Sequence, residues 1–158
     1  MKTLETTLLV IVKDEKILLA QKKRGFGTGM FNGVGGKKQE GETIYEAMIR
    51  ESFEEINVKP INAKLVGKLE FSLYLHEEET TEIMYIYLAN DFEGELQESD
   101  EMRPKWFDLD KIPYESMFAD DTIWLPKVLK GNLVSGRVVF DKDLNMTSQT
   151  IGVVDELS

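Results

Sequence analysis

The stretch from Gly35 to Val58 constrains the fold more than any other, because a glycine-rich loop runs directly into a helix with a marked start. Thr43 is followed three residues later by Glu46, which is the capping box pattern, so the helix should begin at Ile44. At about 100° per residue, apolar and acidic residues separate onto two sides. We therefore predict a helix that packs through Tyr45, Met48, Ile49, Phe53 and Ile56 and presents Glu51, Glu54 and Glu55 on its other face.

These three glutamates indicate a metal site. Carboxylates at i, i+3 and i+4 repel one another, and each like-charge pair destabilises a helix by roughly 0.2 to 0.5 kcal/mol. Arg50 can reach Glu54 one turn away, but one arginine cannot neutralise three acids. Mg²⁺ prefers carboxylate and phosphate oxygens as ligands. The alternative is an acidic face that contacts only solvent, and the acids alone give this alternative about equal weight.

The spacing of the whole stretch resembles the Nudix box, a motif far more specific than a lone glycine pattern. The matching positions are Gly36, Glu42, Arg50-Glu51, Glu54-Glu55 and Val58.

Two positions differ from that motif. Ser52 stands where a bulky apolar residue is usual, and we expect its hydroxyl to bond to the carbonyl of Met48. Asn57 replaces the usual glycine after the helix, where a left-handed backbone is common and Asn is the next most tolerant residue.

Length and composition favour one compact domain over residues 1–158, because the chain has 158 residues and 42% hydrophobic content. It has no cysteine, no apolar run long enough to span a bilayer and no leader-like start, so we expect a cytoplasmic protein that does not contact membranes. The net charge of -10 argues against a nucleic acid polymer as partner, whereas a small triphosphate stays compatible when Mg²⁺ is bound. A monomer is the default expectation.

Strand and helix patterns alternate along the chain, which predicts a mixed α and β fold. Strands are expected at Thr6–Val12, Lys16–Gln21, Lys64–Leu75, Thr81–Leu88, near the end of Glu98–Leu109, at Arg137–Phe140 and at Thr150–Val154, with a second helix at Thr122–Lys130. The only histidine, His76, lies in an acidic loop and is expected to be exposed, so the residue inventory excludes a Ser-His-Asp or Cys-His mechanism. The Nudix resemblance implies an α/β/α sandwich with a mixed β-sheet between helices.

The resemblance extends beyond the box to the branch of oxidised purine nucleoside triphosphatases that cleave 8-oxo-dGTP, over most of residues 6–131. The segments that carry it are 22–27, 32–33, 35–37, 39–43, 98–104, Trp106-Phe107 and Asp120-Asp121. Nothing is transferred onto residues 133–158.

Position by position, the resemblance implies a metal and catalytic set of Glu51, Glu54, Glu55 and Glu101, with the Gly36 carbonyl near the metal. It also implies a substrate-binding set: Asn32, Asp120 and Asp121 at the base, Lys22 near the phosphates, Thr7 and Phe26 in the pocket, and Phe118 where the branch has a stacking tryptophan. Phenylalanine keeps a smaller stacking face without an N–H group.

The implied activity is hydrolysis of oxidised purine nucleoside triphosphates to the monophosphate and pyrophosphate, with Mg²⁺ or Mn²⁺ as cofactor. Glu55 is our choice for the general base, although the sequence does not divide the roles of Glu51, Glu54 and Glu55. The alternatives are another Nudix substrate, such as a nucleotide sugar, a dinucleotide polyphosphate or a modified pyrimidine triphosphate, and a non-catalytic Nudix module.

Overall fold

The computed structural model describes residues 2–25 and 27–157, so the expected role of Phe26 lies outside the described residues. The elements are β1 (Lys2–Lys13), β2 (Lys16–Lys22), β3 (Phe31–Asn32), α1 (Ile44–Ile56), β4 (Lys59–Pro60), β5 (Lys64–Leu75), β6 (Glu78–Ala89), β7 (Phe92–Glu93), β8 (Met102–Asp108), a 3-10 turn (Tyr114–Ser116), α2 (Asp121–Leu129), β9 (Leu133–Phe140), β10 (Met146–Gln149) and β11 (Gly152–Val154).

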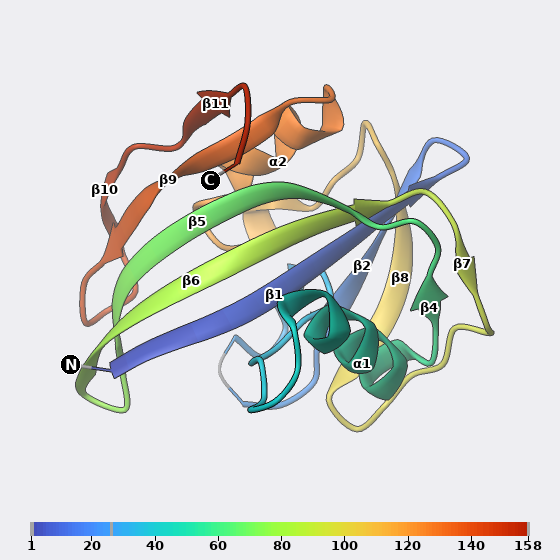
Figure 1. The fold of residues 1–158 in the computed structure, drawn as a ribbon, viewed down its shortest axis with the longest axis horizontal. Coiled ribbons are helices and arrows are strands. Elements are labelled where there is room, and N and C mark those ends of the chain that lie inside the picture. Colours follow the sequence, from blue (N-terminus) through green and yellow to red (C-terminus); the bar gives the residue numbers. More distant parts are fainter. Residues whose placement is uncertain (1, 26, 158) are drawn as a thin grey trace.

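The central sheet is mixed, as predicted. Its order is β10-β9-β5-β6-β1-β2-β3, with β8 also paired to β2 and β11 to β9, while β4 and β7 form a separate ribbon (Figure 1). The pairs β1/β6 and β5/β9 are parallel, and the other pairs are antiparallel. β1 and β6 stay in register from Lys2↔Thr80 to Ile11↔Ala89, which gives the sheet a long centre.

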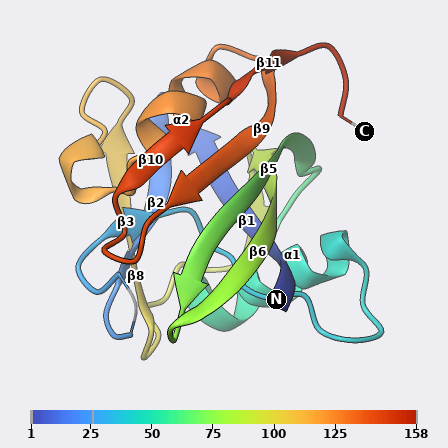
Figure 2. The ribbon, with the colours of Figure 1, turned by 90° about the vertical axis from the view of Figure 1, so that its left-hand side faces the viewer.

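Alternating side chains of the strands build two apolar cores, one on each face of the sheet. Leu8 and Val10 of β1 lie in the core that contains Trp124 and Leu125 of α2. The next residues along the strand, Leu9 and Ile11, lie in the core that contains Met48 and Ile56 of α1. The two helices therefore cover opposite faces, which confirms the sandwich, and Figures 1 and 2 show this layering.

Most expected elements are present with shifted ends. The loop expected at 76–80 is reduced to a turn at His76 and Glu77, both with positive φ, because β5 and β6 remain paired up to Leu75↔Glu78. The strand expected at Thr150–Val154 is wrong at its start, since β11 begins at Gly152, and the polar strand β10 was not expected. No helix in the described part of the chain is long and apolar enough to cross a membrane.

The start and end of α1 follow the prediction. Thr43 and Glu46 form the reciprocal capping box, and Asn57 takes the left-handed conformation with φ 64°. The Ser52 hydroxyl donates to the Met48 carbonyl at 2.8 Å.

The predicted division of α1 into an apolar and an acidic face is wrong at three residues. Tyr45 and Phe53 are 40% and 61% exposed, whereas Glu55 is only 6% exposed. Met48, Ser52 and Glu55 follow one another at spacings of four and three, so they share the face that turns inward. A helical wheel assigns residues to the buried face by their hydrophobicity, so it does not predict a carboxyl there. Burying a carboxyl without compensation is costly.

Candidate active site

The glycine loop is fixed to β1 by backbone hydrogen bonds. Leu9 N donates to Val34 O at 2.7 Å, and Thr7 N donates to Gly36 O at 3.0 Å. A Cβ atom on Gly35 would lie 1.7 Å from the carbonyl oxygen of Thr7, so only glycine allows this approach. The loop is thereby held close to the strand, next to the helix that it leads into.

Gly36 lies against the carboxylate of Glu51. A Cβ atom at this position would be 2.6 Å from the carboxyl carbon of Glu51, so a side chain here would displace that group. The Glu51 side chain is 15% exposed. The structure therefore brings together the two groups that the sequence had assigned to one metal site.

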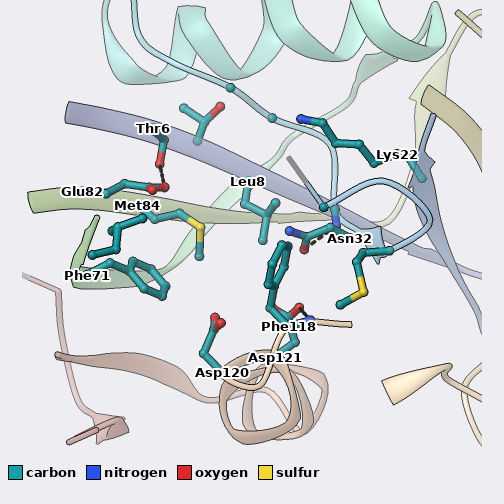
Figure 3. A pocket seen from close by; sticks show the side chains of 18 of the residues that line it. Thr6, Leu8, Lys22, Asn32, Phe71, Glu82, Met84, Phe118, Asp120 and Asp121 are labelled. Carbon is teal, nitrogen blue, oxygen red and sulfur yellow. Dashed lines mark hydrogen bonds between the residues drawn. The ribbon is translucent and has the colours of Figure 1, made fainter. Parts of the chain in front are cut away.

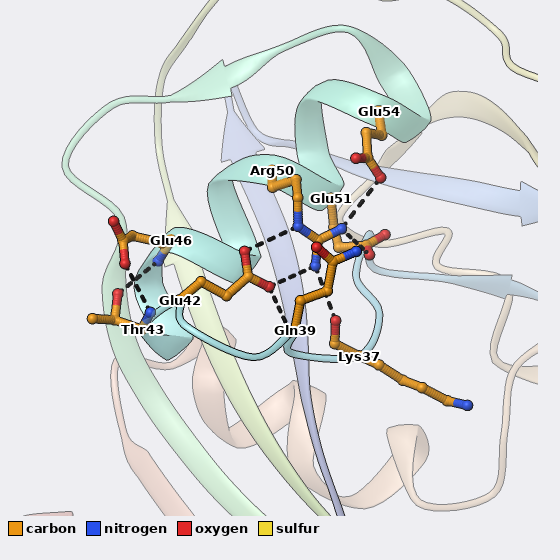
Figure 4. A network of polar contacts seen from close by, with 8 residues as sticks. All are labelled: Lys37, Gln39, Glu42, Thr43, Glu46, Arg50, Glu51 and Glu54. Atoms are coloured by element: carbon orange, nitrogen blue, oxygen red, sulfur yellow. Dashed lines mark hydrogen bonds and ion pairs between the residues drawn. The ribbon is translucent and has the colours of Figure 1, made fainter.

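Arg50 connects the loop to the acidic helix (Figure 4). Its Nε and Nη2 atoms donate to both carboxylate oxygens of Glu42, at 3.0 and 2.7 Å, and Nη2 also donates to the Lys37 carbonyl at 3.0 Å. Nη1 contacts Glu51 at 2.7 Å and Glu54 at 3.3 Å. The bond from Arg50, with the Gln39 amide second, lowers the pKa of Glu42 to about 2. The guanidinium thus stabilises acids that would otherwise repel one another.

Glu55 is the buried acid of the set. Within the described part of the chain, its Oε2 atom has no hydrogen-bond partner. Burial first, then Glu51 and the charge of Glu101, raise the pKa of Glu55 to about 9, while Lys22 opposes them. These groups are therefore close enough to act on one another's charge.

The same residues fit a divalent cation. In the described residues no three acids are already grouped around one point, and Arg50 contacts both Glu51 and Glu54. The Glu55 oxygen without a hydrogen-bond partner is nevertheless available to a cation, and a nearby cation would favour the ionised form of Glu55. Glu54 and Glu101 have side chains 55% and 56% exposed, so they have room to turn toward such an ion. Oxygen donors alone suit a hard cation such as Mg²⁺.

A cavity of about 260 Å³ lies beside this loop (Figure 3). It is lined by every described residue that the sequence had assigned to substrate binding: Thr7, Lys22, Asn32, Phe118, Asp120 and Asp121. Gly36 also lines it, which places the loop against both the cavity and Glu51. Thr7 and Gly36 therefore share one site with segment 118–121, which is far away in the sequence.

The apolar walls of the cavity were missed by sequence reasoning. They include Leu8, Phe71, Leu73, Met84, Met102, Phe140 and Leu144, and the polar residues Thr6, Lys37 and Glu82 also line the space. Strand alternation identifies one face of each strand, but only the sheet order shows that these faces meet. Phe140 and Leu144 come from the C-terminal segment, to which the sequence assigned no role.

Asp120 and Asp121 are both buried, with 4% and 1% exposure. The indole Nε1 of Trp124 donates to Asp120 Oδ2 at 3.0 Å, and the backbone N of Phe118 donates to Asp121 Oδ2 at 3.1 Å. Burial raises the pKa of Asp120 to about 6. Burial, with the charge of Asp120 second, raises the pKa of Asp121 well above its ordinary value. The pair therefore resists carrying two charges.

Asn32 is oriented by its own neighbour. Gly33 N donates to Asn32 Oδ1 at 2.9 Å, so the carboxamide offers its Nδ2 donors to the cavity (Figure 3).

A glycine loop locked to an acidic helix, beside a cavity with buried carboxyls and between the layers of a mixed-sheet sandwich, defines a Nudix-type site. The chain belongs to the Nudix family, since the NUDIX domain model matches residues 2–128. Nudix hydrolases act on small-molecule nucleotides and generally use a divalent metal.

Two relatives that match nearly the whole chain have the same name. The oxidized purine nucleoside triphosphate hydrolase of Danio rerio is 40% identical over 151 residues, covering 96% of both chains. The protein of the same name from Mus musculus is 37% identical over 149 residues, covering 94% of both. Among solved structures, the mutator MutT protein from Bacillus halodurans is similar with a TM-score of 0.84 and 26% identity, covering 94% of this chain and 97% of the other.

Proposed function

We propose that this chain hydrolyses oxidised purine nucleoside triphosphates such as 8-oxo-dGTP to the monophosphate and pyrophosphate, which removes damaged precursors from the nucleotide pool. The observation that carries the proposal is the pair Asp120 and Asp121, buried in an apolar cavity next to the acidic helix. The shared name of the two relatives over nearly the whole chain supports the same substrate class.

The carboxyl pair suits the edge of a guanine-type base. Such a base presents N–H donors at N1 and N2 and an acceptor at O6. An ionised carboxylate accepts from the donors, whereas a protonated carboxyl can donate to O6. Because the raised pKa values keep at least one proton on the pair near neutrality, both functions are present together. Phe118 offers the stacking face.

The reacting phosphates would lie at the end of the cavity formed by Lys22 and Gly36. Mg²⁺, or Mn²⁺ in its place, would be held by Glu51, Glu54, Glu55, Glu101 and the Gly36 carbonyl. When bound, it neutralises charge that develops on the phosphate oxygens. Glu55 takes the proton of the attacking water while the water oxygen bonds to a phosphorus atom and the bond from that phosphorus to the bridging oxygen breaks. Lys22 stabilises the triphosphate by its charge.

Product analysis with a panel of triphosphates tests this proposal. With Mg²⁺, 8-oxo-dGTP should give pyrophosphate and a monophosphate with a higher kcat/KM than dGTP or dCTP. A preference for a nucleotide sugar, a dinucleotide polyphosphate or a pyrimidine triphosphate would assign another Nudix substrate. Binding of 8-oxo-dGTP without turnover would identify a non-catalytic module.

A further inference from the structure

Glu82 is an acidic residue on an otherwise apolar wall of the cavity. It lies on β6 two residues before Met84, so both side chains project from the same face of the strand into the cavity (Figure 3). Phe71 is its partner on β5 and also lines the cavity. A carboxyl in such surroundings is costly unless a partner compensates. Glu82 matches no motif in the sequence, and the hydrolysis proposed above does not use it.

The carboxyl of Glu82 is held in place. Thr6 Oγ1 donates to Glu82 Oε2 at 2.7 Å, and Thr6 is itself 9% exposed on the neighbouring strand β1. Burial raises the pKa of Glu82, while the Thr6 bond and the charge of Lys37 lower it. The Glu82 charge also raises the pKa of Asp120. Glu82 and the aspartate pair therefore act on the same space from different elements.

Asn32 and Glu82 lie on opposite sides of the cavity, with Leu8 and Met84 between them and Asp120 and Asp121 along a third side (Figure 3). Asn32 offers N–H donors, because its Oδ1 accepts from Gly33 N. Glu82 offers an acceptor oxygen.

A base that fits between these groups needs an acceptor on one flank and a donor on the other. A 2-amino-6-oxopurine has this arrangement, with O6 on one flank and the amino group on the other. Its amino group carries two hydrogens, one directed toward the N1 edge and one toward the N3 side. When the aspartate pair binds the N1 edge of the base, it can accept only the amino hydrogen that is directed toward that edge.

We propose that Glu82 is a specificity-determining residue that accepts the second amino hydrogen and so selects 2-amino purines over purines without that group. The proposal rests on the proposed function, because it takes the base to lie in this cavity. It predicts that 8-oxo-dGTP is preferred over 8-oxo-dITP, which differs only by lacking the 2-amino group.

The experiment measures kcat/KM for these two substrates in the wild type, in Glu82→Met and in Thr6→Val. The wild-type ratio should be about 10 or more, in line with the loss of a hydrogen bond to a charged group. Glu82→Met should lower the ratio by at least about 3-fold, mainly by lowering the rate on 8-oxo-dGTP, while the amino hydrogen that the aspartate pair accepts maintains the remaining preference. Thr6→Val, which removes only the donor that holds Glu82, should give an intermediate ratio and serves as the test if Glu82→Met does not fold.

Glu78→Gln is the matched control, because Glu78 is exposed on the same strand and four residues away on the same face. It should keep the wild-type ratio. A wild-type ratio near unity, or an unchanged ratio in both cavity variants, would overturn the role of Glu82 while leaving the hydrolase assignment intact. Absence of turnover on both substrates by the wild type would instead overturn the proposed function. A merely structural role would lower both rates equally and leave the ratio unchanged, which also overturns the proposal.

Discussion

Burial of the Asp120 and Asp121 carboxyls costs free energy, and we propose that hydrogen bonds to a bound base offset this cost. Each is nearly inaccessible to water, and each has only part of its hydrogen-bonding capacity supplied by Trp124 or by the Phe118 backbone. Carboxyls in such positions hold protons that carboxyls in water release. This property provides a direct test on the protein without substrate.

Asp120→Asn should stabilise the protein more at neutral than at acidic pH. The folded pKa of about 6 lies above the ordinary 3.8, so protonation of Asp120 stabilises the folded wild type. This stabilisation is complete below the ordinary pKa and is lost as the pH rises through about 6. Asparagine does not titrate, and its side-chain oxygen can still accept from the Trp124 indole. The difference in unfolding free energy, variant minus wild type, should rise by about 2 kcal/mol between about pH 4.5 and 7.5.

Urea denaturation of both proteins at several pH values measures this difference. Comparing the two cancels the opposite slopes from acids whose pKa is lowered, such as Glu42 and Asp91. A difference that stays constant with pH would show that Asp120 titrates as an ordinary carboxyl.

At the scale of the element, α1 shows which features follow from local sequence. The capping box, the left-handed Asn57 and the Ser52 bond depend on residues within one helical turn, and all three could be predicted. The burial of Glu55 and the exposure of Phe53 could not, because they depend on what packs against the helix. An amphipathic pattern reflects the favourable burial of apolar side chains, so an acid buried for the function that we propose departs from it.

The end of α1 gives a stability prediction. Asn57→Ala should destabilise the fold by about 1 to 2 kcal/mol, because alanine tolerates φ 64° poorly and loses the bond from Asn57 Nδ2 to the Glu95 carbonyl at 3.0 Å. The melting temperature should fall by about 2 to 8 °C. Asn57→Gly keeps the backbone conformation, so its melting temperature should fall by less. Equal melting temperatures for the two variants would mean that the left-handed backbone contributes nothing.

At the scale of the molecule, the site exists because the sheet order unites distant segments. β1 supplies Thr6 to Leu8, β6 supplies Glu82 and Met84, and the segment before α2 supplies Phe118. Family resemblance could identify the residues that match a motif, which are those of the glycine loop, the acidic helix and the aspartate pair. It could not identify Glu82, Phe140 or Leu144, because their place in the cavity depends on strand pairing and on a C-terminal segment without a motif.

This arrangement predicts that base recognition and chemistry can be separated. Asp121→Asn should lower kcat/KM for 8-oxo-dGTP by about 10-fold or more, because it removes a carboxyl that we propose contacts the base. Turnover of dCTP, which makes poor use of the purine cavity, should change by only a few-fold. Steady-state kinetics on both substrates measure the two effects, and equal losses would assign Asp121 to the fold instead of the base.

We propose that Glu55, the buried acid of α1, drives hydrolysis, and the decisive measurement is the kcat of Glu55→Gln on 8-oxo-dGTP at saturating Mg²⁺. Glutamine keeps the shape of the side chain but cannot accept the proton of water, so kcat should fall by at least ~10²-fold. Thermal stability should be kept, because the substitution removes a carboxyl whose burial is unfavourable. A folded Glu55→Gln protein with kcat within a few-fold of the wild type would contradict the assignment.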